Sequence, residues 1–359
     1  MQNLHDRSGN LGGGVLHKIS DESPYELIIS LENLLGAWKE FKRGKTRKPD
    51  VQEFDAALEE NLFEIHDALK IKTYRPAPYV SFFISDPKRR SIHKACVRDR
   101  VVHQALFRVL YPVFNKTFIH DSYSCRLGKG THRGVRQLAR YLRTVSGNHR
   151  HTAYALKCDI RKFFENIDHG ILIGFLEKRI PDPGTRWLAR QIISSFPMSK
   201  VEPCSKTGLP LGNVTSQLFS NIYLNEFDQW AKHTLKARHY LRYCDDFIIV
   251  HSDAGYLRGI IPVIQKTLHK KLKLTLHHHK VSITKIIQGV DFLGYVALPH
   301  ATMVRTSSKN RMFRKLQEKK KLVQKGVITE ESFNHSRQSY LGLLMHANTQ
   351  KLREQVKAL

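Results

Sequence analysis

One short stretch constrains the fold of this chain more than any other. Residues 241–250 read Leu-Arg-Tyr-Cys-Asp-Asp-Phe-Ile-Ile-Val, so two adjacent carboxylates, Asp245 and Asp246, separate two apolar runs. Apolar runs divided by a short polar break are typical of a β-hairpin, which predicts the acidic pair at its tip. Because successive side chains of an extended chain point to opposite faces, the two carboxylates need not have the same role. We expect one of them to bind a cation.

A hairpin of this kind is an incomplete cation site, since Mg²⁺ usually binds through one or two carboxylates together with a substrate phosphate. The best further candidate is Asp159, which ends a mostly apolar, strand-like segment at 154–159. Ligands gather at strand ends in α/β folds. Asp159 and Asp245 would then hold two metal ions roughly 3.5 to 4 Å apart, an arrangement suited to nucleotidyl transfer. Taken alone, an Asp-Asp pair also suits a solvated turn.

The order and spacing of these motifs, from about Ser81 to Tyr295, resemble the reverse transcriptase family: Tyr-x-Asp-Asp lies between two apolar strands and follows Asp-x-x-x-Phe-Phe. The resemblance implies an α+β right-hand polymerase fold, with fingers, a palm built on an antiparallel sheet, and a helical thumb. It also implies an RNA-directed DNA polymerase. The implied catalytic residues are Asp159, Asp245 and Asp246. These carboxylates and the backbone carbonyl of Ile160 would bind two Mg²⁺ ions, for which Mn²⁺ can substitute.

A glycine-containing loop lies between the two acidic motifs. Residues 208–217 read Gly-Leu-Pro-Leu-Gly-Asn-Val-Thr-Ser-Gln and precede apolar residues at helical spacing, which predicts a loop entering a helix. Gly212 permits close approach of the backbone to a base pair or a phosphate. Reverse transcriptases generally have Gln-Gly-x-x-x-Ser-Pro here, whereas this chain has Leu211 for the Gln and Gln217 for the Pro. This variant resembles the reverse transcriptases of diversity-generating retroelements, which copy a template RNA with errors at adenines. Because Leu211 cannot hydrogen-bond to the nascent pair, it could tolerate mispairs.

The resemblance assigns further residues to substrate binding. Phe164 occupies the position under the sugar of the incoming nucleotide, where a bulky ring favours deoxynucleotides, although Phe163 and Phe164 also suit a core. Lys88 and Arg90 lie in a segment resembling the fingers hairpin that reaches the triphosphate. Lys280 lies near the place of a family lysine that acts on the leaving pyrophosphate. Phe292, Leu293 and Gly294 resemble the turn that braces the primer end. These assignments complete the predicted nucleotide-binding and primer-grip residues.

The composition agrees with a polyanionic partner. The chain carries 59 Lys plus Arg against 32 Asp plus Glu, a net charge of +27, which predicts salt-sensitive binding to nucleic acid. We find no run of 18 apolar residues and no signal-peptide pattern, so we expect no membrane association and a cytoplasmic location. The consecutive histidines at 277–279 cannot easily converge on one ion, so we expect them to be exposed or to contact RNA.

Three regions are predicted. Residues 1–70 form an N-terminal helical extension, with helices at 27–35 and 53–70, and residues 71–300 form interwoven fingers and palm. Residues 301–359 form a basic helical thumb, because the stretch 305–359 has 13 Lys or Arg against 4 Glu in a largely helical pattern.

The resemblance also implies partners and a bacterial or phage origin. They are a template RNA, its cDNA product, deoxynucleotide substrates, and either a small basic accessory protein or a noncoding RNA. Two other interpretations fit the same residues. A bacterial antiphage-defence reverse transcriptase would carry the same palm motifs. A non-enzymatic RNA-binding module would make no demand on Asp159, Asp245 or Asp246.

Overall fold

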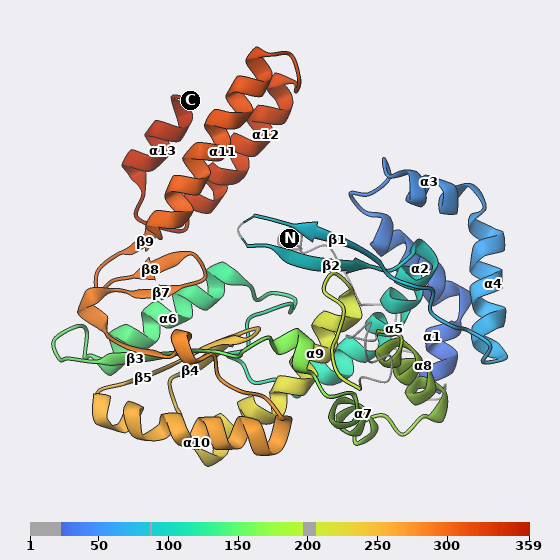
Figure 1. Cartoon of the computed structure of the whole chain (residues 1–359), viewed down its shortest axis with the longest axis horizontal. Coiled ribbons are helices and arrows are strands. Elements are labelled where there is room, and N and C mark those ends of the chain that lie inside the picture. The colour runs from blue at the N-terminus through green and yellow to red at the C-terminus, as the bar shows by residue number, and fades with distance from the viewer. Residues whose placement is uncertain (1–22, 87, 197–205) are drawn as a thin grey trace. The chain divides into compact units, whose positions relative to one another are not determined.

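The structure is a computed structural model that describes residues 23–86, 88–196 and 206–359, and the chain divides into two compact units (Figure 1). The first unit combines Met1–His120, Ile160–Thr234 and Gln265–Thr275. The second combines Asp121–Asp159, Leu235–Ile264 and Leu276–Leu359. Helix α10 (Ala254–Leu272) contributes residues to both.

In its described residues, the first unit is mostly helical and contains one antiparallel hairpin, β1–β2. Its elements are α1 (Pro24–Ile29), α2 (Leu31–Lys42), α3 (Pro49–Ala56), α4 (Leu58–Lys70), β1 (Val80–Ile84), β2 (Arg90–Lys94), α5 (Val97–Asn115), η1 (Phe163–Asn166), α7 (His169–Glu177), α8 (Pro183–Ser194), α9 (Val214–Gln229) and the π-helical turn η2 (Trp230–Thr234). Helix α9 confirms the helix predicted after the glycine-containing loop.

The second unit is built on antiparallel sheets, one with the strand order β4-β5-β3-β6 and one with the order β7-β8-β9. Its elements are α6 (Thr131–Val145), β3 (Tyr154–Asp159), β4 (Tyr240–Tyr243), β5 (Asp246–His251), η3 (His278–Lys280), β6 (Ser282–Lys285), η4 (Ile286–Gln288), β7 (Val290–Phe292), β8 (Tyr295–Ala297), β9 (Thr302–Val304), α11 (Thr306–Gln324), α12 (Glu330–Leu344) and α13 (Gln350–Lys357). The predicted α+β class with an antiparallel sheet is confirmed.

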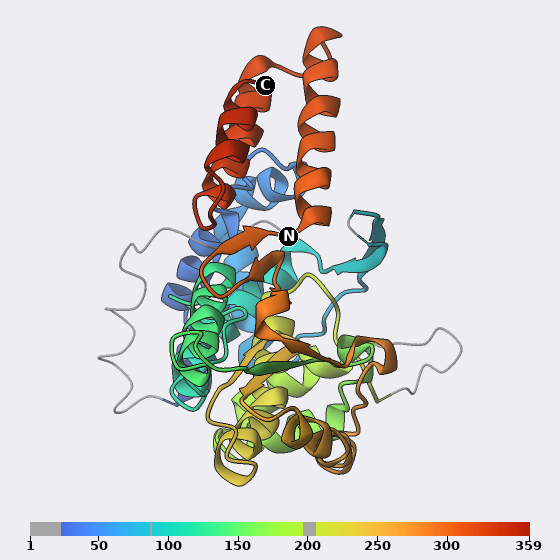
Figure 2. The ribbon, with the colours of Figure 1, turned by 90° about the vertical axis from the view of Figure 1, so that its left-hand side faces the viewer.

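One hydrophobic core runs through the second unit. It joins residues of the sheets, such as Ile248 and Phe292, to Leu138 of α6 and to Leu316 of α11. Helices α11, α12 and α13 run alongside one another (Figures 1 and 2). The C-terminal helices therefore share their core with the sheets, and the predicted helical pattern of this region is confirmed.

The helix predicted at 27–35 is wrong in one respect, because Ser30 interrupts it. The Ser30 backbone N–H donates to the Glu26 carbonyl at 3.0 Å, which ends α1. Its side-chain oxygen accepts from the Asn33 backbone N–H at 3.2 Å, which caps α2. Serine is a favoured N-cap residue, so one polar side chain in an apolar pattern divides the helix.

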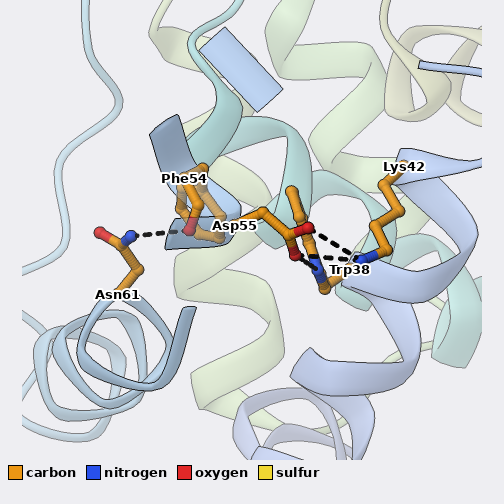
Figure 3. A network of polar contacts seen from close by, with 5 residues as sticks. All are labelled: Trp38, Lys42, Phe54, Asp55 and Asn61. Atoms are coloured by element: carbon orange, nitrogen blue, oxygen red, sulfur yellow. Dashed lines mark hydrogen bonds and ion pairs between the residues drawn. The ribbon is translucent and has the colours of Figure 1, made fainter. Parts of the chain in front are cut away.

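The helix predicted at 53–70 is likewise two helices, α3 and α4, separated at Ala57 (φ −120°, ψ 47°). Figure 3 shows the contacts that hold this break. Asn61 Nδ2 donates to the Phe54 carbonyl at 3.1 Å, satisfying a backbone group at the end of α3. The Asp55 carboxylate accepts from Trp38 Nε1 at 3.1 Å and from Lys42 Nζ at 3.0 Å. Tertiary contacts from α2 and α4 therefore fix a break that the apolar periodicity does not reveal.

A close contact anchors α1 to α8 in the first unit. A Cβ atom at Gly184 would lie 2.4 Å from Tyr25 Cγ, and the Tyr25 hydroxyl donates to the Leu69 carbonyl at 2.6 Å. The ring is therefore held at both ends and cannot move aside for a side chain at position 184.

We expect Gly184→Ala to lower the free energy of unfolding by about 1 to 3 kcal/mol, the usual cost of overpacking. Gly174→Ala is the matched control, because no atom lies within 4 Å of a Cβ at Gly174 in helix α7. There we expect a gain of about 0.5 to 1 kcal/mol from helix propensity. Urea unfolding followed by circular dichroism measures both. Equal effects at the two positions would contradict the contact with Tyr25.

Candidate active site

The acidic pair lies at the predicted hairpin, and its turn is short. Strands β4 and β5 are antiparallel, with Tyr243 opposite Asp246, so Cys244 and Asp245 form a two-residue connection. Cys244 has φ +55°, a left-handed conformation that hairpin turns of this length require and that L-residues other than Gly adopt at a cost. Strained backbone of this kind persists only where the surroundings determine it, and such positions cluster at functional sites.

Strand β3 brings the third carboxylate to the same place. It pairs with β5 in antiparallel register, and its last residue, Asp159, lies directly opposite Asp246. Asp245 precedes Asp246 in the connection, so three carboxylates from two neighbouring strands gather at one end of the sheet. Asp159 is buried, with 8% of its surface exposed. The prediction that Asp159 ends a strand beside the acidic pair is confirmed.

Burial and the charges of neighbouring carboxylates raise the affinity of Asp245 and Asp246 for protons. Burial, and then the charge of Asp159, raise the pKa of Asp245. Burial raises the pKa of Asp246 to about 6, with the charges of Asp245 and Asp159 adding to the shift and Lys157 opposing it. The positive charges of Lys157 and Lys280 offset this shift only in part. A bound cation would supply further compensating charge.

The donor set fits divalent metal ions that prefer oxygen. Among the described residues, no group of three or more His, Cys, Asp or Glu side chains is arranged to hold a metal ion by itself. Mg²⁺ does not need a closed cluster, because it usually retains waters and takes one or two carboxylates plus substrate phosphates. Asp159, Asp245 and Asp246 supply carboxylate oxygens, and Ile160 follows Asp159 directly and is buried. The residues present therefore fit an open site completed by a phosphate-bearing substrate.

A lysine lies against the buried carboxylate. Lys280 Nζ donates to Asp159 Oδ2 at 2.8 Å. The short helix η3 positions it, and the chain just before η3 is fixed by a bond from the His277 backbone N–H to the Asp159 carbonyl at 2.8 Å. His278 and His279 are exposed, as expected, whereas His277 is half-buried. The histidine run thus shapes the turn that carries Lys280.

The predicted primer-grip residues form a tight turn in the second unit. Phe292 of β7 pairs with Tyr295 of β8, leaving Leu293 (φ +52°) and Gly294 (φ +88°) as a two-residue connection. Positive φ at both positions is the mark of the type I′ turn that joins short hairpins. The Gly294 carbonyl accepts from the Arg305 backbone N–H at 2.9 Å, which fixes the turn to the start of α11.

The glycine-containing loop is held by backbone bonds within the first unit. The Leu209 N–H donates to the Phe164 carbonyl at 2.8 Å, and the Leu211 carbonyl accepts from the His93 N–H of β2 at 3.1 Å. Asn213 Nδ2 donates to the His93 carbonyl at 3.3 Å. Gly212 is exposed with φ +118°, a conformation that favours glycine. The loop is therefore tied both to the segment that carries Phe164 and to the β1–β2 hairpin.

The remaining candidates also belong to the first unit. Lys88 and Arg90 are exposed in the β1–β2 hairpin, Lys88 in its connection and Arg90 at the start of β2. Phe163 is buried, whereas Phe164 is half-buried beside it, with ring centroids 5.2 Å apart. Phe163 therefore belongs to the core, and Phe164 retains an accessible face.

Comparison with known proteins decides the family. A family profile described as "Reverse transcriptase (RNA-dependent DNA polymerase)" matches residues 85–297, more than half of the chain. The chain belongs to the reverse transcriptase family. Reverse transcriptases are RNA-directed DNA polymerases, so the predictions of a right-hand polymerase fold and of a nucleotidyltransferase are confirmed.

The relatives of this reverse transcriptase include bacterial proteins. It is 27% identical to protein YkfC of Escherichia coli strain K12 over 275 residues, covering 67% of this chain and 72% of that protein. It is 23% identical to the group II intron-encoded protein LtrA of Lactococcus lactis subsp. cremoris over 307 residues, covering 67% of this chain and only 50% of LtrA. A solved structure of telomerase from Candida albicans with a fragment of telomeric RNA matches with TM-score 0.48 and 13% identity, over 66% of this chain and 46% of that one. Across the described residues of this reverse transcriptase, no helix is both long and apolar enough to span a bilayer.

Sequence reasoning missed Arg242, which supports the hairpin tip of this reverse transcriptase. Arg242 lies in β4 and is fully buried. Its Nη1 donates to the Cys244 carbonyl at 3.1 Å, and its Nη2 donates to Ser122 Oγ at 3.1 Å. The signal in the sequence is a cation in an otherwise apolar strand. A buried charge of this kind needs partners, and here the strained turn is one of them.

Proposed function

We propose that this reverse transcriptase synthesises cDNA on a template RNA by two-metal nucleotidyl transfer. The observation that carries the proposal is the strand register, which sets Asp159 opposite Asp246 with Asp245 beside it in the turn. Asp159, Asp245, Asp246 and the Ile160 carbonyl would hold two Mg²⁺ ions, with Mn²⁺ as a substitute. Bound there, the ions would activate the primer 3′-hydroxyl and stabilise the pyrophosphate leaving group.

The protein's own residues supply binding and charge. Lys280 carries a positive charge to the acidic end of the sheet, where its ion pair with Asp159 is 41% exposed on the lysine side and can exchange for substrate phosphate oxygens. Lys88 and Arg90 would bind the triphosphate, since exposed cations on a hairpin suit a mobile polyanionic ligand. Phe164 would lie against the deoxyribose. Phe292, Leu293 and Gly294 would brace the primer end.

The same proposal divides the chain into regions. Residues 1–70 form the N-terminal helical extension, 71–300 the fingers and palm, and 301–359 the thumb. The 13 Lys or Arg in residues 305–359 suit binding to the sugar-phosphate backbone.

Within the family, we propose a retroelement enzyme of the diversity-generating type, which performs mutagenic retrohoming. Leu211 and Gln217 support this subtype, as they stand where reverse transcriptases generally have Gln and Pro. Leu211 is half-buried, and its backbone is fixed by His93. The aliphatic side chain therefore lies on a defined backbone with no polar group to offer a base pair. Intron-encoded relatives such as LtrA favour a retroelement origin. A small basic accessory protein or a noncoding RNA would complete the particle.

Leu211→Gln tests the subtype. We expect the error rate opposite template adenine to fall several-fold, because the amide restores a polar group against which mispairs are discriminated. Sequencing of cDNA copied from one defined RNA measures this rate at each template base. Leu211→Met is the matched control, as it keeps an apolar side chain of similar size, and its error rate should stay unchanged. An error rate at adenine that Leu211→Gln leaves unaltered would remove Leu211 from the explanation. Faithful copying by the unaltered protein would favour a defence-associated reverse transcriptase.

A further inference from the structure

Helix α6 carries an exposed row of arginines that the proposed active site does not use. Arg133, Arg136, Arg140 and Arg143 are all exposed. Their spacing of three, four and three residues places them on one helical face, and ten residues of α-helix span about 15 Å. The helix contains no Asp or Glu. We call these four residues the α6 arginine row.

The opposite face of α6 fixes the row in place. Gly134, Val135, Leu138 and Leu142 are buried, and α6 packs on β4, β5 and β8 (Figure 1). A Cβ at Gly134 would lie 3.4 Å from Leu293 Cδ1. The arginine row therefore stands on a helix packed tightly against the core of the second unit, so a ligand would meet a preformed surface.

Local contacts leave the positive charge of the row uncompensated. Arg140 Nη1 donates to Gln137 Oε1 at 3.2 Å, Arg143 Nε donates to Asn148 Oδ1 at 2.7 Å, and Arg133 contacts the Gly128 carbonyl. These acceptors are all neutral. In the part of the chain that the structure describes, no carboxylate forms an ion pair with the row. Like charges one turn apart destabilise a helix, and a bound polyanion would remove this repulsion.

We propose that the α6 arginine row binds the sugar-phosphate backbone of double-stranded RNA. Arginine recognises phosphate bidentately, and an unneutralised row of arginines on a well-packed helix suits a regular polyanion. Tyr141 is the one Phe, Tyr or Trp of α6; it is half-buried, and its hydroxyl donates to Asp121 Oδ2 at 2.6 Å, so its ring is tied to Asp121 rather than free to stack on an unpaired base. Single-strand binders rely on such rings, whereas RNA duplexes are bound through shape and backbone contacts. The surface would hold a folded part of the RNA. This inference rests on the proposed function only in that the enzyme binds RNA.

The test compares Arg136→Gln/Arg140→Gln with Lys266→Gln/Lys270→Gln, which removes two exposed charges from α10 instead. The probe is a blunt RNA duplex of about 20 base pairs, titrated by fluorescence anisotropy at several salt concentrations. We expect the arginine variant to bind roughly tenfold more weakly at low salt, with a salt-dependence slope smaller by about two, while the lysine variant keeps the binding constant and slope of the unaltered protein. Circular dichroism checks that both variants are folded.

A second measurement separates this inference from the proposed function. Extension of a short DNA primer on an unstructured RNA template should be equal in the arginine variant and the unaltered protein. An inactive unaltered protein would count against the proposed function and not against duplex binding. Equal duplex affinity and salt slope in the arginine and lysine variants would overturn the inference. The inference would also be overturned if the arginine variant lost affinity only for an acidic polypeptide such as poly-glutamate and not for the RNA duplex. That result would identify the row as a protein-binding surface.

Discussion

Asp245→Asn is expected to lower the rate of RNA-templated deoxynucleotide incorporation by roughly 10³-fold or more, equivalent to about 4 kcal/mol of transition-state stabilisation. Asp159→Asn should have a similar effect, since the two residues are proposed to share both metal ions. Asp253→Asn is the control, because Asp253 is exposed and caps the start of α10 by accepting from the Gly255 N–H, which Asn can also do. Single-turnover extension of a labelled primer measures all three. Activity of Asp245→Asn within tenfold of the unaltered protein would contradict the assignment.

The raised pKa of Asp246 should also make the thermal stability of the protein depend on pH, which can be measured without any catalysed reaction. Because the folded-state pKa of Asp246 is raised to about 6 from an ordinary 3.8, its contribution to stability is present at low pH and is lost as the pH rises through about 6. Asp246→Asn should therefore raise Tm in EDTA at pH 7.5 and raise it less at pH 5, where the carboxyl is largely protonated. Mg²⁺ should raise the Tm of the unaltered protein more than that of the variant. A Tm difference independent of pH would contradict the electrostatic account.

Arg242→Lys should impair both stability and synthesis while keeping the charge. Lysine lacks the planar fork that reaches the Cys244 carbonyl and Ser122 Oγ together. Hydrogen bonds from a charged donor contribute about 1.5 to 3 kcal/mol, so losing one should lower the free energy of unfolding by about 2 kcal/mol. A displacement of the turn by about 1 Å could cost roughly 10²-fold in rate.

The control for Arg242→Lys is Arg258→Lys on α10, where the arginine is exposed and the change should be within about 0.5 kcal/mol. Urea unfolding and primer extension are measured on both variants. If Arg242→Lys retained the stability and rate of the unaltered protein, the buried fork would not be what holds the catalytic turn.

The sequence predicted the elements that local pattern determines. The polar break between apolar runs predicted the β4–β5 hairpin, and the apolar segment before Asp159 predicted a strand with that residue at its end. The chain pattern could not predict the register that opposes Asp159 to Asp246, because register depends on pairing between segments distant in sequence. It also missed the helix breaks at Ser30 and Ala57. Both are fixed by hydrogen bonds to particular polar groups, which apolar periodicity does not detect.

The burial of polar side chains was also not predicted from the sequence. Arg242 and Lys157 lie in strands and have apolar neighbours in the sequence. The spacing of residues does not show where the charged end of such a long side chain lies. In the structure, Lys157 Nζ donates to the Asp291 carbonyl at 3.0 Å, and Arg242 Nη1 donates to the Cys244 carbonyl in the turn. The contact between Lys280 and Asp159 joins positions 121 residues apart. Such contacts depend on tertiary packing, so sequence spacing alone leaves them undetermined.

The most direct test of the central claim is to supply the purified protein with a defined RNA template, a DNA primer, Mg²⁺ and all four deoxynucleotides, and to sequence the product. The Asp245→Asn/Asp246→Asn double variant serves as control and should retain its affinity for RNA. The account predicts cDNA complementary to the RNA from the unaltered protein, dependent on Mg²⁺, and none from the double variant. RNA binding without any templated product, or equal product from both proteins, would contradict it.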